Sequence, residues 1–216
     1  MFLWINRFVA LVAEAHRQGP VIEFGSKWTP GQEFISDLRG CFPTLPYFGC
    51  DLWPGKGVDL QANAIMTPFP DGCAGTIVAC EVLEHCESPG GAISEYLRLL
   101  RPDGLLIITT PFYLTIHHLP DYWRFTPQGM ERLLREFPFR EIYFFGNFAF
   151  PRTVMAIAAK QGKVITPVVE HLAKHLGELP AAAAGEGVWR WTGAMQYSLM
   201  RLADEQKERQ LGQIFG

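Results

Sequence analysis

A glycine and an aspartate in the first quarter of the chain have the spacing of a nucleotide-type binding site. Val21 and Ile22 begin an apolar run that breaks at Gly25, where a residue without a Cβ lets a ligand approach the backbone. A second apolar run ends in Asp51, about 25 residues after that glycine. A carboxylate there can accept hydrogen bonds from both hydroxyls of a ribose. We therefore expect the turn at Gly25 and the carboxylate of Asp51 to face one cleft.

The turn after Gly25 differs from the glycine-rich turn of dinucleotide-binding proteins. Residues 26–28 read Ser-Lys-Trp, where a dinucleotide fold places glycines against a pyrophosphate. The sequence therefore disfavours a pyrophosphate ligand. A nicotinamide-dependent oxidoreductase on a similar sheet stays an alternative, and the missing second and third glycines argue against it.

Histidines and a tyrosine further along the chain are candidates for proton transfer. His117, His118 and Tyr122 follow an apolar run, on a loop expected to overhang the cleft, and His85 follows an earlier run. A histidine near a reacting hydroxyl or amine can act as a general base. In the alternative interpretation the segment around Arg124 packs as a structural plug, with that arginine paired to an acid. A histidine pair without further acidic ligands is weak evidence for a metal, so we expect no metal site.

The elements that position these residues alternate between strands and helices. Apolar runs predict strands at residues 21–24, 47–50, 76–80, 105–112, 139–150 and 153–160, and a short strand from Val58. Helical spacing and capping residues predict helices over residues 2–15, from Thr29-Pro30 to Gly40 with Phe34 on the inner face, from Ser88-Pro89, from Thr126-Pro127, and over residues 163–177. Residues 101–104 predict a turn, and residues 188–210 a helix with a charged end.

This alternation predicts an α/β fold with a doubly wound, mostly parallel sheet and helical additions at both ends. Ligands of such sheets bind at the carboxyl ends of the strands, where the strand order reverses. Gly25, Asp51, Asn63, Glu81 and Pro111 are all expected at that edge. We expect one domain over residues 1–162 and a helical C-terminal extension over residues 163–216, with a linker at residues 178–187. The extension is a candidate surface for a homodimer.

Composition limits the classes of partner. The chain has 216 residues, of which 48% are hydrophobic, enough to bury a full core, and a net charge of −3 gives no electrostatic footprint for nucleic acid. Five cysteines without a C-x-x-C pair favour reduced thiols in a cytoplasmic protein. Polar residues interrupt the first helix, so we expect no membrane span. A small-molecule substrate is the expected partner.

Several motifs in order resemble one known family. These are EFGS at the first turn, GCDLWPGKGVD, CEVLEH, EYLRLLRPDGLLIITTPF and HHLPDYWRFTPQGM, within residues 20–160. They resemble the class I S-adenosylmethionine-dependent methyltransferases, in particular the branch with a methyltransferase type 11 domain. The resemblance implies a seven-stranded Rossmann-like fold, S-adenosylmethionine as cofactor, and methyl transfer to an unidentified small molecule.

The resemblance also assigns expected roles to individual positions. The turn from Glu23 to Ser26, with Gly25, would hold the methionine portion of the cofactor. Asp51 would bind the ribose hydroxyls with Leu52 beside it, Asn63 and Ala64 would lie near the adenine amino group, and Glu81 would line the cleft beside the sulfonium. The candidate catalytic residues are His117, His118 and Tyr122.

Two positions depart from the family pattern. The first turn reads GSKWTPG in place of the usual G-x-G, and Gly75 stands where the family commonly has an aspartate before a buried strand. An activated sulfonium methyl needs mainly proximity, orientation and exclusion of water, so a universal catalytic residue is not expected. The alternative function is a non-catalytic cofactor-binding or interaction module with a degenerate methyltransferase fold.

Overall fold

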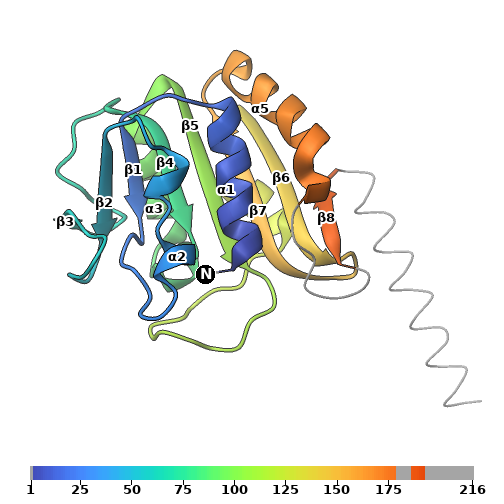
Figure 1. Cartoon of the computed structure of the whole chain (residues 1–216), viewed down its shortest axis with the longest axis horizontal. Helices are drawn as coiled ribbons and strands as arrows, with labels where there is room; N and C mark the ends of the chain where they lie inside the picture. Colours follow the sequence, from blue (N-terminus) through green and yellow to red (C-terminus); the bar gives the residue numbers. More distant parts are fainter. Residues whose placement is uncertain (1, 179–185, 193–216) are drawn as a thin grey trace, which may run out of the picture.

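One sheet runs through the computed structural model, which describes residues 2–178 and 186–192 (Figure 1). Within these residues the sheet has eight strands, in the order β3-β2-β1-β4-β5-β7-β6-β8. Strands β1 to β5 pair in parallel, whereas β7 is antiparallel to β5 and β6, and β8 is antiparallel to β6. The bounds are β1 Val21–Phe24, β2 Tyr47–Asp51, β3 Leu60–Gln61, β4 Ala74–Cys80, β5 Leu100–Pro111, β6 Phe139–Asn147, β7 Phe150–Ala159 and β8 Gly187–Arg190.

Helices cover both faces of the sheet. The α-helices are α1 Leu3–Ala15, α2 Glu33–Ser36, α3 Pro89–Leu99, α4 Pro127–Leu133 and α5 Gly162–His175, and the 3-10 helices are η1 Arg39–Cys41, η2 Leu83–His85 and η3 Leu176–Glu178. Helices α1 and α5 lie side by side on the face toward the viewer in Figure 1, and α3 lies behind the sheet. The sheet therefore separates two apolar layers.

Side chains of the central strand β4 point alternately into these two layers. Strand β4 is buried along its whole length. Val78 packs in the layer under α1 and α5, whereas Ile77 and Ala79 pack in the layer with α3 and α4. A strand buried on both faces needs a continuous apolar run, which is the pattern that predicts this element. Each large apolar side chain so buried contributes about 1.5–3 kcal/mol.

The predicted doubly wound α/β fold is confirmed, and so are most of its elements. The capping predictions hold at two helices. The Ser88 hydroxyl accepts a hydrogen bond from the Gly91 amide at 3.2 Å, before α3. The Thr126 hydroxyl accepts one from the Gly129 amide at 2.9 Å, before α4. Both hydroxyls satisfy amides of the first turn that have no partner inside the helix.

The helix expected from Thr29-Pro30 was wrong in its start and its length, and of its predicted inner face Leu38 is buried but Phe34 is not. The structure has the four-residue helix α2, preceded by Gln32 without a side-chain cap. Phe34 is 76% exposed. The reason is a turn at Gly31, whose φ of +78° interrupts any helix that begins at Pro30. Gly40 lies within the separate helix η1.

Three other local predictions need correction. Strand β3 begins at Leu60 and not at Val58. The expected turn at residues 101–104 is a bulge within β5, because the pairing with β4 jumps from Ala74–Leu100 to Thr76–Leu105. Residues 188–190, expected to begin a helix, lie in β8, which makes eight strands in place of seven.

Strand β8 forms because its side chains have partners on β6. Arg190 forms an ion pair with Glu141 at 2.7 Å, and the Trp189 indole donates to the Gly146 carbonyl at 3.2 Å. These contacts favour an extended strand over the helix that the sequence pattern indicates. Most of the predicted linker and the rest of that predicted helix, residues 179–185 and 193–216, lie outside the described residues.

Helix α5 confirms the helix predicted over residues 163–177. Its Val168 and Leu172 are buried in the same apolar layer as α1. The division of the chain at residue 162 into a domain and an extension stays a prediction. Within residues 2–178 and 186–192, every helix is too short or too polar to cross a bilayer.

Candidate functional site

The carboxyl ends of the parallel strands meet at one edge of the sheet. In Figure 1 the arrowheads of β1, β2 and β4 point toward this edge, where the loop of residues 112–126 also lies. Strand β1 is followed in the sheet by β2 on one side and by β4 on the other, so the strand order reverses between β1 and β4. A crevice at such a reversal is where open α/β sheets bind ligands.

The first turn and Asp51 are in direct contact, as the sequence predicts. The Lys27 amide donates to Asp51 Oδ2 at 3.2 Å, and the Trp53 amide donates to Asp51 Oδ1 at 2.9 Å. The Ser26 amide donates to the Cys50 carbonyl at 3.1 Å, which joins the turn to β2. The carboxylate is therefore held by two amides, and each oxygen keeps a lone pair for a further donor.

Gly25 has a packing role that the sequence analysis missed. Its φ is +75°, and an added Cβ would lie 2.4 Å from Val82 Cγ2. Val82 follows β4, so the turns after β1 and β4 touch at the point where the strand order reverses. Any side chain at position 25 would thus clash with Val82, which is a reason for the glycine that does not depend on a ligand.

The loop after β2 packs over the first turn. The Trp28 amide donates to the Lys56 carbonyl at 2.9 Å, and a Cβ on Gly57 would lie 2.4 Å from the Ser26 carbonyl. Such close backbone contact requires glycine at position 57. The Ser26 side chain is buried beneath this loop, and its Oγ has no hydrogen-bond partner among the described residues.

Glu23, also predicted for the site, is bonded to a tyrosine of the neighbouring strand. Its carboxyl accepts a hydrogen bond from the Tyr47 hydroxyl at 2.9 Å. Tyr47 packs against the apolar layer of α1, on a face of the sheet and not at its carboxyl edge. Burial raises the pKa of Glu23 to about 8 and also raises the pKa of Tyr47. The structure therefore gives Glu23 a buried partner, and the charge of Asp51 also contributes to raising the pKa of Glu23.

The loops after β2 and β3 carry the remaining residues predicted for the cofactor. Leu52 is 50% exposed, and Ala64 is partly buried. Asn63 Oδ1 accepts a hydrogen bond from the Ile65 amide at 3.1 Å, which leaves this oxygen one further lone pair. Exposed apolar side chains gather on these loops, namely Leu52, Trp53, Ile65 and Met66. They offer apolar surface of the kind that a flat aromatic ring covers.

Glu81 lies at the end of β4 in an unusual backbone conformation. Its φ is +56°, rare for a residue with a side chain and frequent at functional sites. Its Oε1 accepts a hydrogen bond from the Thr109 hydroxyl at 3.0 Å. Burial raises the pKa of Glu81 to about 7.

The histidines predicted for catalysis lie beside a glutamate that the sequence analysis missed. Glu84 is fully buried, and one of its oxygens lies 3.7 Å from His85 Nε2. The rings of His85 and His117 are 5.1 Å apart between centroids. Burial raises the pKa of Glu84 well above its usual range and lowers the pKa of His117. The spacing E-x-x-E-H at residues 81–85 is the sequence signal for this cluster.

The loop of residues 112–126 is braced against this cluster. Asp121 forms a bidentate ion pair with Arg124, at 2.5 and 2.8 Å, and accepts from the His117 amide at 3.0 Å. The Arg124 guanidinium holds the pKa of Asp121 well below its usual range. The Tyr122 amide donates to the Glu84 carbonyl at 2.8 Å. Arg124 is thus paired as the plug interpretation expects, but Tyr122 and Trp123 are exposed and not in the core.

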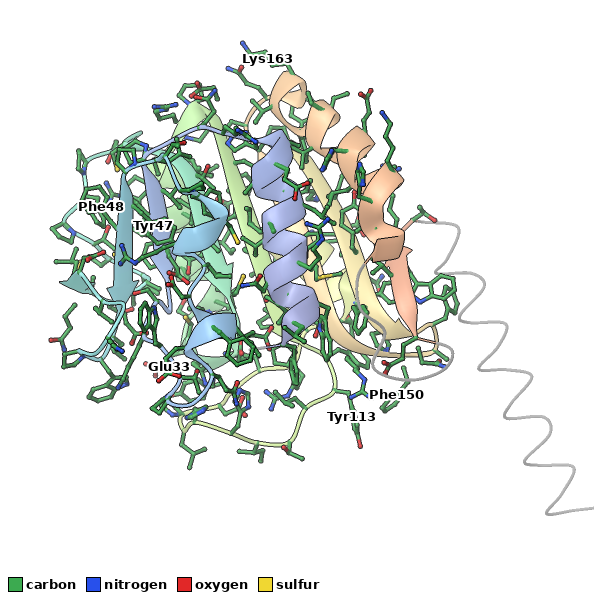
Figure 2. The ribbon with its side chains drawn as sticks, in the orientation of Figure 1. Glu33, Tyr47, Phe48, Tyr113, Phe150 and Lys163 are labelled. Carbon is green, nitrogen blue, oxygen red and sulfur yellow. The ribbon has the colours of Figure 1, made fainter. Side chains whose placement is uncertain are left out.

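His118 and Tyr122 flank the cluster without entering it. The His118 ring centroid lies 5.6 Å from that of His117, and His118 has a φ of +42°. The same loop exposes Tyr113, Ile116, Leu119 and Trp123. Figure 2 shows Tyr113 next to Phe150, with ring centroids 4.7 Å apart. The loop therefore presents apolar surface beside the histidines.

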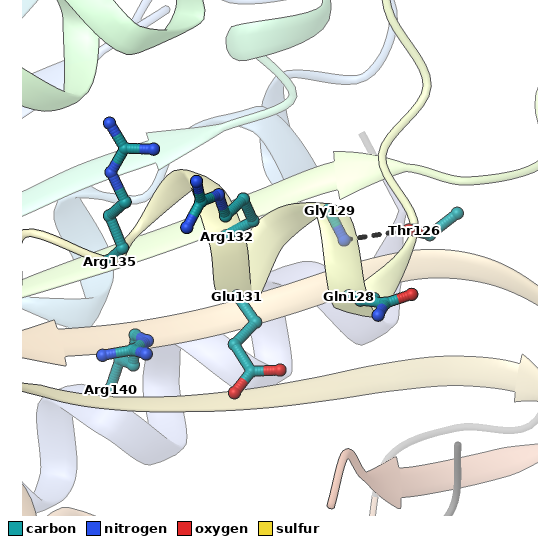
Figure 3. Close-up of a pocket in the computed structure, with 7 residues that line it drawn as sticks. All are labelled: Thr126, Gln128, Gly129, Glu131, Arg132, Arg135 and Arg140. Atoms are coloured by element: carbon teal, nitrogen blue, oxygen red, sulfur yellow. Dashed lines mark hydrogen bonds between the residues drawn. The ribbon is translucent and has the colours of Figure 1, made fainter. Parts of the chain in front are cut away.

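A separate hollow of about 550 Å³ lies over α4 (Figure 3). It is lined by Thr126, Gln128, Gly129, Glu131, Arg132, Arg135 and Arg140. All of these lie on or near α4, and none is a residue predicted for the site. The hollow is wide open to solvent, so we distinguish it from the site at the strand ends.

Comparison with known proteins identifies the family of the central segment. Residues 48–108 match the family model described as a methyltransferase domain. Two probable S-adenosylmethionine-dependent methyltransferases of Mycobacterium tuberculosis, MT3114 and Rv3030, are each 36% identical over 56 residues. The match covers 26% of this chain and 20% of either relative, so the chain aligns with about a fifth of the length of these relatives.

Solved structures share the fold. A SAM-dependent methyltransferase from Archaeoglobus fulgidus has a TM-score of 0.56 at 13% identity, over 71% of this chain and 92% of its own. A SAM-dependent methyltransferase from Thermotoga maritima has a TM-score of 0.52 at 16% identity, over 73% and 92%. The trans-methyltransferase CalH in complex with SAH has a TM-score of 0.51 at 15% identity, over 72% and 57%.

The cofactor of this family is S-adenosylmethionine, and the residues present fit its adenosyl portion. Asp51 lies at the carboxyl end of β2, is oriented by two amides and adjoins exposed apolar side chains. In its strand order, in the family model over residues 48–108 and in its partial match to the relatives, this chain is similar to the class I S-adenosylmethionine-dependent methyltransferases.

Proposed function

We propose that this protein transfers a methyl group from S-adenosylmethionine to a small-molecule acceptor. The observation that carries the proposal is the Asp51 carboxylate, held by the Lys27 and Trp53 amides next to the glycine turn. A carboxylate fixed in this way needs little reorganisation to accept hydrogen bonds from a ribose.

Residues around Asp51 would hold the cofactor. Asp51 would accept hydrogen bonds from the ribose hydroxyls, and Leu52 would cover the adenine ring. Asn63 and Ala64 would lie near the adenine amino group, where Asn63 Oδ1 keeps a lone pair. Gly25 and Ser26 would adjoin the methionine portion, and Glu81 the sulfonium end. Glu23, whose carboxyl accepts a hydrogen bond from Tyr47, would adjoin the methionine portion with Gly25 and Ser26.

The chemistry asks for positioning more than for a dedicated catalytic group. The bound cofactor supplies a methyl group already activated by its sulfonium. The chain would orient the acceptor and exclude water from it, and the exposed apolar side chains of residues 112–126 suit an acceptor with an apolar portion. Where the acceptor must lose a proton, His117 would accept it, with His118 and Tyr122 as neighbouring candidates.

Cysteine chemistry supports a cytoplasmic setting for this function. All five cysteines are free thiols, and burial raises the pKa of Cys50 to about 12 and that of Cys41 to about 11. Such thiols are unreactive and persist in a reducing compartment. A homodimer through the C-terminal segment is part of the proposal, and most of that segment lies outside the described residues.

Calorimetric titration separates this proposal from the oxidoreductase, and an assay for demethylation of the cofactor separates it from the non-catalytic module. An active enzyme and a non-catalytic module both bind S-adenosylmethionine, but only the enzyme demethylates it when an acceptor is supplied. An oxidoreductase would bind NAD instead. Binding of NAD, or of neither compound, would exclude the methyltransferase.

Asp51→Ala tests whether the Asp51 carboxylate binds the cofactor. Loss of a charged acceptor costs about 1.5–3 kcal/mol, so we expect the dissociation constant of the demethylated cofactor to rise about 10- to 100-fold. Calorimetry measures this change. Asp103→Ala is the matched control, because Asp103 pairs with Arg101 near the amino end of β5. Equal affinity in the Asp51 variant and the wild type would refute the role of Asp51.

A further inference from the structure

We propose that Glu84, His85 and His117 bind one divalent transition-metal ion. The three residues come from two segments, the turn after β4 and the loop after β5, which meet at the carboxyl edge of the sheet. The inference rests on donor geometry, on the partners of both imidazoles and on an unpartnered carboxylate. Only the catalytic use of the ion depends on the proposed methyltransferase function.

The donor atoms are close enough for one ion to join them. One ligand atom from each residue lies within 4.8 Å of the other two. Metal bonds of about 2.0–2.2 Å at the tetrahedral angle place two ligand atoms about 3.3–3.6 Å apart. The cluster would therefore close by up to about 1.4 Å on binding, a change that rotation of the histidine rings supplies.

His85 presents its outer nitrogen to the cluster, with Nε2 3.7 Å from a Glu84 oxygen. His85 Nδ1 lies 2.7 Å from the Pro120 carbonyl, and a carbonyl only accepts, so Nδ1 carries the proton. His117 Nδ1 lies 3.3 Å from Asp121 Oδ2. Both neutral rings thus keep a lone pair on Nε2. Histidines that bind metals are oriented by this kind of contact to a carbonyl or carboxylate.

Glu84 supplies the carboxylate. Its side chain is fully buried, and neither oxygen has a hydrogen-bond partner among the described residues. The other two buried glutamates among the described residues are partnered, Glu23 by Tyr47 and Glu95 by Arg98, and so is the half-buried Glu81, by Thr109. A buried carboxylate without partners is costly, and a cation beside it would remove that cost.

Backbone contacts hold the two segments in register. The Tyr122 amide donates to the Glu84 carbonyl at 2.8 Å, and the Trp123 indole donates to the Cys86 carbonyl at 2.9 Å. The ion pair of Asp121 with Arg124 fixes the acid behind His117. The donor set is therefore supported by a second layer of contacts, as binding sites for ions require.

Two imidazoles and one carboxylate select the class of ion. This donor set suits Zn²⁺, Co²⁺, Fe²⁺ or Mn²⁺, whereas Mg²⁺ and Ca²⁺ prefer sites made of oxygen alone. Three protein ligands leave coordination positions open. Under the proposed function an acceptor hydroxyl would take one of these positions and lose its proton more readily.

A second histidine pair provides an internal control. His171 and His175 lie one turn apart on α5, with ring centroids separated by 4.5 Å. His171 Nε2 lies 3.1 Å from Glu14 Oε2, so this nitrogen already has a partner. Adventitious binding by helical histidines would depend on His171 and not on His117.

Titration of the chelator-stripped, full-length chain with Co²⁺ alone tests the site, with visible absorption and calorimetry as readouts. We expect one ion per chain, displaced by Zn²⁺. Affinity should fall at least about tenfold in Glu84→Gln and in His117→Ala, and should be unchanged in His171→Ala. Thermal unfolding should show Glu84→Gln to be as stable as the wild type or more so, because the change removes an unpartnered buried carboxylate. If Glu84→Gln does not fold, the Co²⁺ affinity of His117→Ala, a change at the partly exposed end of the cluster, decides whether the site exists.

Three results would overturn the site: no binding by the wild type, equal binding by all variants, or loss confined to His171→Ala. The outcome is independent of the cofactor. Co²⁺ binding without binding of S-adenosylmethionine would leave the metal site standing and refute the methyltransferase. Binding of S-adenosylmethionine without binding of Co²⁺ would refute the metal site and leave the methyltransferase proposal standing.

Discussion

Glu23 and Glu84 are both buried, and their surroundings differ in chemistry. Glu23 accepts a hydrogen bond from Tyr47, which stabilises either protonation state of the carboxyl. Glu84 faces two imidazoles and receives no hydrogen bond from the described residues. Burial alone therefore does not identify a functional acid. A neighbouring hydrogen-bond donor indicates a structural role, whereas neighbouring imidazoles without such a donor indicate a binding site.

Glu23→Gln should change the pH dependence of stability. The pKa of Glu23 is about 8 in the folded chain and near 4.5 in the unfolded chain, so between these values the folded state holds one more proton. The wild type therefore has its full stability below pH 4.5 and loses it as pH rises toward 8. The glutamine does not titrate, so its variant should not lose this stability. We therefore expect the free energy of unfolding of the variant, relative to that of the wild type, to rise by about 1–3 kcal/mol from pH 5 to pH 9.

Urea denaturation at several pH values measures this gain. Glu87→Gln, at an exposed glutamate, is the matched control. Parallel stability curves for Glu23→Gln and the wild type would contradict a buried, protonated Glu23.

At the scale of elements, the site depends on two turns that touch. Gly25 ends β1, Val82 follows β4, and their contact leaves no space for a Cβ. The same position requires a left-handed backbone. Packing between turns thereby sets how closely the two sides of the crevice approach each other, and with it the position of Glu81 relative to Asp51.

Gly25→Ala should destabilise the fold more than Gly31→Ala. Both glycines have a positive φ, of +75° and +78°, but the space around Gly31 is open. The backbone cost of about 1–2 kcal/mol applies to both variants. The contact with Val82 should add about 1–3 kcal/mol for Gly25 alone.

Chemical denaturation followed by circular dichroism compares the two variants. A second change, Val82→Ala, should restore part of the stability lost in Gly25→Ala. Equal losses in the two glycine variants would show that backbone strain, and not the contact of the turns, is the cause.

At the scale of the whole molecule, one sheet separates the site from the helices that stabilise it. Gly25, Asp51 and Glu81 lie where parallel strands end at the carboxyl edge, whereas Lys163 at the start of α5 lies at the opposite edge (Figure 2). Ligands at the carboxyl edge should therefore affect a restricted part of the chain.

Hydrogen exchange tests this separation. Under the proposed function, binding of the demethylated cofactor should slow amide exchange in residues 25–28, 51–66 and 81–86. Exchange in α5 and in the strands β6 and β8 should not change, and these elements serve as the internal control. Protection confined to α4 would place the ligand in the arginine-lined hollow instead.

Most of the fold could be predicted from patterns that act over a few neighbouring residues, such as apolar runs and helix caps. The continuous apolar run of β4 and the capping serines and threonines indicate their elements correctly. Predictions failed where distant contacts decide. Residues 188–190 form a strand because β6 offers partners, and the helix after Pro30 is short because Gly31 turns the chain.

The candidate site was predictable at the first turn and less so at the second. Spacing places Gly25 and Asp51 correctly at one edge, since parallel strands end together. Glu84 was missed because a glutamate in a short helical turn reads as a solvated residue. Its burial arises only when the loop with Tyr122 folds over it, a contact across 38 positions that no local pattern reports.

The bonds that join this loop to the turn after β4 limit how the entrance can move. Displacing the whole loop would break the bonds from the Tyr122 amide and the Trp123 indole, each of which contributes about 0.5–1.5 kcal/mol. Residues 112–119 lie before these anchors and carry the exposed Tyr113, Ile116 and Leu119. Because His117 lies on this stretch and its amide is held by Asp121, substrate entry and product release would depend on rotation of these exposed side chains and not on displacement of the loop backbone.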